Sequence, residues 1–249
     1  MIKIQNLTLS FGDHIVFDDL NIHFLAQQWS ILLGPSGVGK STLLRAMAGL
    51  EKKAIKQGSI DLGGRIAWLG QRDSLYPWLS LIDNVRLKDY LTGQKNQQNL
   101  EQAKYLLQQV GMEQHWHKPC YQLSGGQRQR VALARTLMQE ADIVLMDEPF
   151  SALDAVTKLQ LQNLAYKLLG HKTVILITHD PQEALRLANR IYVLHYITPL
   201  EQQGQATFSS PIEFDKHKYG MAPRSLHHST LWQLEQKLLQ QLMPGGGNV

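Results

Sequence analysis

The first residues that could do chemistry form a glycine-rich loop that ends in a lysine and a serine. Residues 34–41 match the pattern G-x-x-x-x-G-K-S/T and follow an apolar run at Trp29–Leu33. Such a loop turns backbone N–H groups toward phosphate oxygens, the lysine supplies a compact positive charge, and the serine hydroxyl can bind Mg²⁺. The pattern therefore predicts a phosphate-binding site made by Gly34, Pro35, Ser36, Gly37, Val38, Gly39, Lys40, Ser41 and Thr42.

Two acids and a histidine follow two further apolar runs. Asp147 and Glu148 come directly after residues 143–146, and His179 follows residues 174–177 closely. Asp147 can reach Mg²⁺, Glu148 can orient or deprotonate a water aimed at a terminal phosphate, and His179 can hydrogen-bond that phosphate or the water. A strand that ends in acids is common in other proteins, and a lone histidine is more often structural. The phosphate loop favours the catalytic interpretation.

A second serine-glycine turn precedes a helical pattern. Ser124, Gly125, Gly126 and Gln127 are followed by apolar residues at helical spacing, of which Val131 is the first. The start of a helix offers unpaired N–H groups to an anion. On its own, a Ser-Gly-Gly turn is a common loop, so this second group gains meaning only beside the first.

These groups need strands to position them. The runs at Trp29–Leu33, 143–146 and 174–177 have branched apolar residues at consecutive positions, as buried strands of a parallel sheet do. Each run is followed by polar or glycine-rich residues. Ligands of open α/β sheets bind beyond the carboxyl ends of the strands, so the three polar groups predict one composite site.

The amino-acid composition changes between residues 73 and 140, where a Gln-rich, helix-favouring sequence indicates an inserted helical subdomain. Residues 101–112 carry apolar side chains at helical spacing. We expect a nucleotide-binding core from residues 1–72 and 141–200, the helical subdomain at 73–140, and a C-terminal extension at 201–249. The extension ends in a helix, because Leu231, Leu234, Leu238 and Leu242 share a face.

Composition narrows the classes of protein. The 249 residues carry a net charge of +4 and a single cysteine, Cys120, which excludes an internal disulfide and a cysteine-based zinc framework. The N-terminus lacks the pattern of a signal peptide, and no apolar run approaches the roughly 18 residues that a membrane-spanning helix needs. We therefore expect a chain that stays inside the cell and works at a membrane only through a partner.

The order of these motifs, with residues 151–154 between the acids and the histidine, resembles the ATP-binding subunit of an ABC transporter over about residues 1–200. The resemblance implies an α/β fold of the P-loop NTPase (RecA-like) type. Its parts are a mostly parallel sheet, an N-terminal antiparallel β-subdomain and an inserted α-helical subdomain. It also implies ATP and Mg²⁺ as ligands.

The resemblance also implies residue roles. Gln71 corresponds to the glutamine that touches Mg²⁺ and water, so the metal would be held by Ser41, Gln71 and Asp147, and catalysis would rest on Glu148, His179 and Gln71. Phe11 matches an aromatic residue that stacks on adenine. Two subunits face head to tail, so Ser124 and Gly126 of one copy close over the nucleotide held by Lys40 of the other, with Asp154 at the seam.

The partners implied are a membrane permease, a second copy of the chain and, indirectly, an extracytoplasmic solute-binding protein. The chain would lie on the cytoplasmic face of the inner membrane. Residues 74–79 carry apolar side chains that suit docking on the permease, and packing within the helical subdomain explains them equally well. Leu75 to Leu79 and Asp83-Asn84-Val85 are similar to the importer branch for nitrate, taurine, aliphatic sulfonates and thiamine precursors.

The alternative class is a soluble ABC-type ATPase linked to nucleic acid or the ribosome. The spacing argues against it, because Ser124 lies only 84 residues beyond Lys40, which leaves no room for a long coiled coil. The chain holds one ATPase core, which excludes the translation factors that carry two cores in tandem. A single cysteine excludes the zinc sites of the excision-repair ATPases. We therefore expect an importer subunit that hydrolyses ATP and has no nucleic-acid partner.

Overall fold

The computed structural model describes residues 1–94, 96–197, 205–215, 219–225 and 229–242. The chain forms two compact units, which are described separately. The first contains residues 1–65 and 169–249, and the second contains residues 66–168.

The first unit begins with an antiparallel sheet of three strands. Strands β1 (Ile2–Phe11), β2 (His14–Phe24) and β4 (Ile55–Asp61) lie in the order β2-β1-β4. Gly12 has a φ of +57° in the tight turn that pairs Phe11 with His14, a conformation in which glycine carries no side-chain penalty. On β1, Ile2, Ile4 and Leu7 are buried. The expected N-terminal antiparallel β-subdomain is confirmed.

A second sheet follows in the same unit. Strands β3 (Trp29–Leu33), β7 (Thr173–Thr178) and β8 (Arg190–Tyr196) are parallel, and β9 (Ala206–Phe208) and β10 (Ile212–Glu213) pair antiparallel with β8. Every residue of β3 and β7 is buried, as predicted from their unbroken apolar runs. Helices α1 (Lys40–Met47), α7 (Pro181–Leu187) and α9 (Ser229–Leu242) belong to this unit, and a short 3-10 turn spans Lys52–Ala54.

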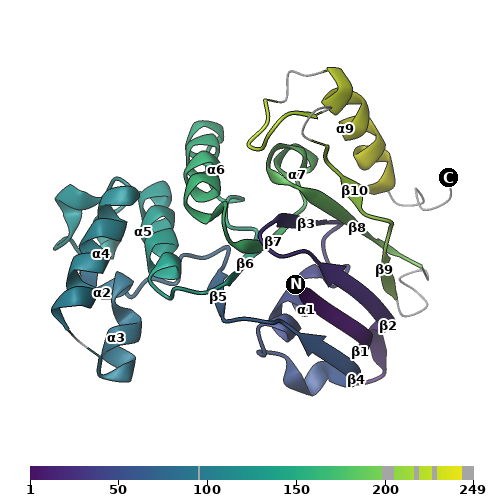
Figure 1. Cartoon of the computed structure of the whole chain (residues 1–249), viewed down its shortest axis with the longest axis horizontal. Helices are drawn as coiled ribbons and strands as arrows, with labels where there is room; N and C mark the ends of the chain where they lie inside the picture. Colours follow the sequence, from purple (N-terminus) through teal and green to yellow (C-terminus); the bar gives the residue numbers. More distant parts are fainter. Residues whose placement is uncertain (95, 198–204, 216–218, 226–228, 243–249) are drawn as a thin grey trace. The chain divides into compact units, whose positions relative to one another are not determined.

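The second unit is mostly helical. Strand β5 (Ile66–Leu69) is parallel to β6 (Ile143–Asp147). The helices are α2 (Leu81–Val85), α3 (Leu87–Thr92), α4 (Gln97–Gln109), α5 (Gly125–Leu137) and α6 (Ala155–Leu169), and 3-10 turns span Glu113–His115 and Cys120–Gln122. Helices α2, α4 and α5 pack together around the buried side chains of Leu81, Leu107 and Val131. The group lies at the left of Figure 1.

Helix α4 differs from the predicted span of 101–112. It begins at Gln97, because the side chain of Asn96 accepts the backbone N–H of Asn99 at 2.7 Å and caps the helix. It ends at Gln109, and Gly111 follows with a φ of +70°. Apolar periodicity located the helix, and the capping residues determine its ends.

The predicted terminal helix is present as α9. Its residues Leu231 and Leu238 are buried, while Leu234 and Leu242 are half-buried. Residues 201–204, 216–218, 226–228 and 243–249 of the predicted extension lie outside the described residues. Within the described ranges, none of the helices has the length and apolar character that crossing a bilayer requires.

Candidate active site

The predicted phosphate loop joins β3 to α1. Gly39 caps α1 with a φ of +103°, and a Cβ at this position would lie 2.5 Å from Cγ1 of Val16, so only glycine fits. Lys40 is buried, and its Nζ donates hydrogen bonds to the carbonyl oxygens of Gly34 and Pro35, both at 2.7 Å. The ammonium is therefore held inside the loop, next to the N-terminal N–H groups of α1. This arrangement suits an anion.

His179 directly follows β7, the strand that pairs with β3. In the parallel pairing of β3 with β7, Leu33 is opposite Thr178. Gly34 and His179 are therefore the first residues beyond the same edge of the sheet, as the strand-end argument predicted for these two groups. His179 is exposed.

Asp147 is the last residue of β6 in the second unit, and Glu148 follows it. Both are half-buried, and Glu148 has a φ of +47°, a left-handed conformation that is unusual for glutamate and often found at functional positions. The turn is closed by Ser151, whose hydroxyl donates to the carbonyl oxygen of Glu148 at 3.0 Å. The Nε2 of Gln71 donates to that same hydroxyl at 3.2 Å. Ser151 therefore links the predicted catalytic glutamine to the turn that carries the predicted general base.

The segment after Gln71 is held by α5. Gln129 is buried and its Nε2 donates to the carbonyl oxygen of Gln71 at 2.9 Å. Arg135 donates to the carbonyl oxygens of Asp73 and Ser74 at 2.5 and 2.8 Å. Burial lowers the pKa of Arg135 from its ordinary value, and Asp73 opposes that shift.

A salt bridge at 2.9 Å joins Asp73 to Arg128, which also lies on α5. Sequence reasoning assigned no role to Gln129, Arg135 or Ser151. The partners of Gln129 and Arg135 lie 58 and 62 residues away in the sequence, so no local pattern marks these contacts. Ser151 belongs to the motif at residues 151–154, but its bond to Gln71 spans 80 residues.

The second serine-glycine turn begins α5, as predicted. Ser124 accepts the N–H of Gln127 at 3.2 Å, and the Gln127 side chain accepts the N–H of Ser124 at 3.0 Å, which makes a capping box. At Gly126, a Cβ would lie 2.4 Å from Cγ2 of Thr157, so the start of α5 fits against α6 only without a side chain.

Asp154 is exposed before α6, where its Oδ1 accepts the N–H of Thr157 at 3.0 Å. Hydrogen bonds from the side chain and backbone of Thr157 lower the pKa of this carboxyl.

The sequence model of the protein family described as ABC transporter matches residues 17–151 of this chain. The chain belongs to the ABC transporter family. The family predicted from the order of the motifs is thus confirmed.

Named relatives and a solved structure agree with this assignment. An uncharacterized ABC transporter ATP-binding protein of Haemophilus influenzae is 55% identical over 244 residues, covering 97% of this chain and 98% of the relative. The aliphatic sulfonates import ATP-binding protein SsuB 1 of Paracoccus denitrificans is 42% identical and covers 78% of each chain. A dimeric bacterial ABC transporter cassette superposes with a TM-score of 0.67 at 30% identity, covering 78% of this chain and 94% of that one. The predicted P-loop fold class is confirmed.

In this ABC protein, two predicted contact positions are accessible. Phe11 ends β1 with 47% of its surface exposed. In the segment 74–79, Trp78 is 74% exposed, and its ring meets that of Tyr76 edge to face at 5.3 Å. The exposure of Trp78 favours the docking interpretation of this segment over local packing.

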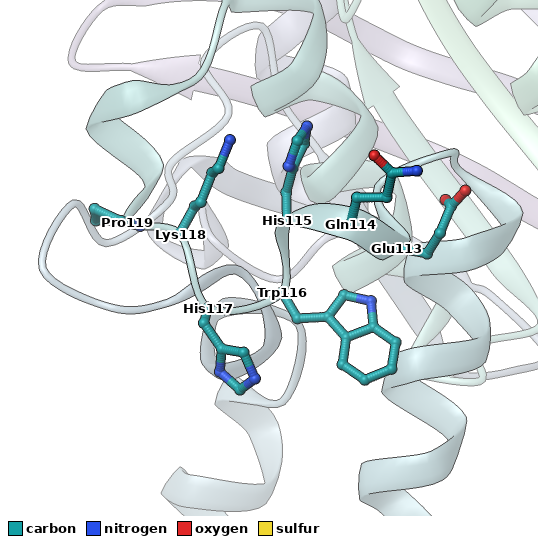
Figure 2. A pocket seen from close by; sticks show the side chains of 7 residues that line it. All are labelled: Glu113, Gln114, His115, Trp116, His117, Lys118 and Pro119. Carbon is teal, nitrogen blue, oxygen red and sulfur yellow. The ribbon is translucent and has the colours of Figure 1, made fainter.

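A hollow runs along residues 113–119, which lie in the sequence between the end of α4 and the serine-glycine turn at Ser124 (Figure 2). Its side chains do not converge, because His115 and Lys118 point to one side while Trp116 and His117 point to the other. None of the predicted site residues lines this hollow. Among the described residues, no group of three or more His, Cys, Asp or Glu side chains is arranged to hold a metal ion.

Proposed function

We propose that the chain is the ATP-binding and ATP-hydrolysing subunit of an ABC importer and energises uptake of a small solute through a separate permease. The observation that carries the proposal is the buried Lys40, fixed by the carbonyls of Gly34 and Pro35 at the start of α1. His179 at the same edge of the sheet supports it. The name of the sulfonate relative, an import ATP-binding protein, supports the importer direction.

In this function the loop of residues 34–42 binds the phosphates, and Phe11 stacks on the adenine. Glu148 orients and deprotonates the attacking water, and His179 hydrogen-bonds the terminal phosphate. Both groups act on the phosphate that leaves, so they affect hydrolysis more than binding of ADP.

Mg²⁺ would be held by the Ser41 hydroxyl, the Gln71 amide oxygen and the Asp147 carboxylate, an all-oxygen donor set that suits this ion. The Gln71 nitrogen is engaged by Ser151, so the oxygen is the end of the amide directed away from that bond. When bound, Mg²⁺ neutralises charge on the phosphates.

A head-to-tail dimer completes the proposed site. Ser124, Gly125, Gly126 and Gln127 of the second copy close over the nucleotide, and Asp154 lies at the seam. The exposed Trp78 and its neighbours in residues 74–79 dock on the permease at the cytoplasmic face of the inner membrane. A solute-binding protein outside delivers the solute, and no nucleic acid takes part.

The catalytic proposal is tested with Glu148→Gln, which keeps the shape of the side chain and removes its basicity. Loss of a general base lowers kcat by about 10²- to 10⁴-fold, while ATP binding is retained. Glu113→Gln, an exposed glutamate, is the matched control and should hydrolyse ATP at the parental rate. Parental turnover by Glu148→Gln would show that Glu148 is not the base.

The shared site is tested by mixing subunits that carry Lys40→Ala with subunits that carry Ser124→Arg. A mixed dimer has one intact composite site and should recover part of the activity that each variant lacks alone. No recovery at any mixing ratio contradicts the head-to-tail site. Purification from the source cells separates the classes, since a permease should accompany the chain, whereas DNA or ribosomes would support the alternative.

A further inference from the structure

His179 is linked to the first turn of α7 through its two neighbours in the sequence, Thr178 and Asp180. Thr178 donates its hydroxyl proton to the Glu183 carboxylate at 2.6 Å, and the Asp180 side chain accepts the N–H groups of Gln182 and Glu183 at 2.9 and 3.4 Å. The residues on both sides of His179 are thus bonded to α7. A shift of this seven-residue helix must move His179 as well.

The C-terminal extension contacts the start of α7 and forms a hydrogen bond with it. Helix α9 lies beside α7 in the first unit (Figure 1). The Nε2 of Gln182 donates to Oε1 of Glu235 on α9 at 2.9 Å, and Leu231 and Leu238 are buried on the same helix. Gln182 is only three residues from His179.

The extension also forms hydrogen bonds with the end of α7. Arg224 is buried, and its Nη1 donates to the carbonyl oxygens of Leu185 and Ala188 at 3.1 and 2.7 Å. The backbone N–H of Arg224 donates to the carbonyl oxygen of Arg186 at 2.9 Å. These are carbonyls of the last turn, which have no partner within a helix, and a cation there also complements the helix dipole.

The guanidinium of Arg224 is itself held in place. It lies 4.3 Å from the centre of the Phe214 ring, and its Nε donates to the carbonyl oxygen of Gly220 at 3.2 Å. The Nη1 of Arg186 donates back to the carbonyl oxygen of Arg224 at 2.8 Å. Both ends of α7 are therefore bonded to a part of the chain that carries none of the predicted nucleotide-binding residues.

We propose that the extension positions His179 through α7, with Glu235 and Arg224 as positioning residues for ATP hydrolysis. The inference rests on the proposed contact of His179 with the terminal phosphate. Neither residue touches the nucleotide. Their effect is confined to the nucleotide that has a γ-phosphate, so ATP binding is affected and ADP binding is not.

The test measures Kd for ATP and for ADP on the full chain carrying Glu148→Gln, which prevents turnover during the measurement. Glu235→Ala should lower the preference for ATP over ADP by about 2- to 10-fold, the range for one hydrogen bond, with the Kd of ADP unchanged. Glu235→Gln keeps an acceptor oxygen and should restore the preference. Lys237→Ala, exposed on the same helix, should have no effect.

A double-mutant cycle with His179→Ala decides whether the effect runs through His179. If it does, Glu235→Ala has no further effect once His179 is gone. The positioning role is overturned if Glu235→Ala lowers the ATP preference equally with and without His179, or if it does not lower the preference when His179 is present. A His179→Ala variant with unchanged ATP preference would instead contradict the proposed function of His179 itself.

Arg224→Lys supplies an independent variant, since it keeps the charge but cannot reproduce the set of bonds to the carbonyls of α7. It should reduce the ATP preference in the same direction and leave ADP binding unchanged. A loss of affinity for both nucleotides would indicate general damage to the unit and would contradict the proposal.

Discussion

Asn84 is fully buried and holds the backbone of the proposed docking segment. Its Oδ1 accepts the N–H of Tyr76 at 2.8 Å, and its Nδ2 lies 3.1, 3.3 and 3.1 Å from the carbonyl oxygens of Tyr76, Leu79 and Ser80. It also lies 3.1 Å from the sulfur of Cys120. One amide thus organises a loop that contains no regular structure.

Asn84→Ala should destabilise the second unit, and the hydrogen bonds that remain set the magnitude. The carbonyl of Tyr76 keeps the N–H of Leu79, and the carbonyl of Ser80 keeps the N–H of residue 84. The N–H of Tyr76 loses the Asn84 bond, and the carbonyl of Leu79 keeps the weak thiol of Cys120 at 3.8 Å. Each polar group left without a good partner costs about 1–3 kcal/mol, and partial access to water places the sum at about 2–4 kcal/mol.

The assay is thermal unfolding followed by circular dichroism, with amide hydrogen exchange at Tyr76 as a local measure. A loss of this size lowers Tm by roughly 4–16 °C for a chain of this length, and the Tyr76 amide should exchange faster. Asn99→Ala is the control, because the side chain of Asn99 makes one exposed hydrogen bond, to the carbonyl oxygen of Gln94. A Tm within 2 °C of the parent, or unchanged exchange at Tyr76, would refute the assignment of these bonds to Asn84.

Two further predictions concern the second unit. Gly126→Ala should lower Tm, because the added Cβ overlaps Cγ2 of Thr157 at a cost of about 1–3 kcal/mol, whereas Gly125→Ala, which has open space around it, should not. Thr157→Ser removes the methyl group and should rescue Gly126→Ala. A Gly126→Ala chain as stable as the Gly125→Ala chain would disprove the overlap. Burial raises the pKa of the Cys120 thiol, and the negative charge of Asp73 raises it further. Less thiolate therefore exists at any given pH, so the pH profile of alkylation by a thiol reagent should lie at higher pH for the native chain than for the unfolded chain. Coincident profiles would contradict the burial of this thiol.

Local patterns predicted the parts of the fold that depend on neighbouring residues. The strands at Trp29–Leu33 and Thr173–Thr178 and the helix start at Ser124 agree with the structure, because unbroken apolar runs and capping residues lie within a few positions of one another. The boundary of α4 was missed because the cap at Asn96 was not recognised.

Long-range bonds could not be predicted in this way. Gln129 bonds the carbonyl of Gln71 across 58 residues, and Arg224 bonds that of Leu185 across 39. Glutamine and arginine are common on solvated helix faces, and only the folded chain shows which of them are turned inward. The roles of such residues depend on packing, while the roles of Lys40 and Glu148 are suggested by their motifs.

The bonds from α5 to the segment after Gln71 have a mechanical consequence. Arg135, which bonds Ser74 of the docking segment, and Ser124, which caps α5, are eleven residues apart in the sequence. The docking segment and Ser124 are therefore joined by a stiff helix of about 16 Å. Turning such a helix by 10° about one end moves the other by about 3 Å, the length of a hydrogen bond. A small push at Ser74 is therefore large enough to make or break a bond at Ser124 without any change inside the helix.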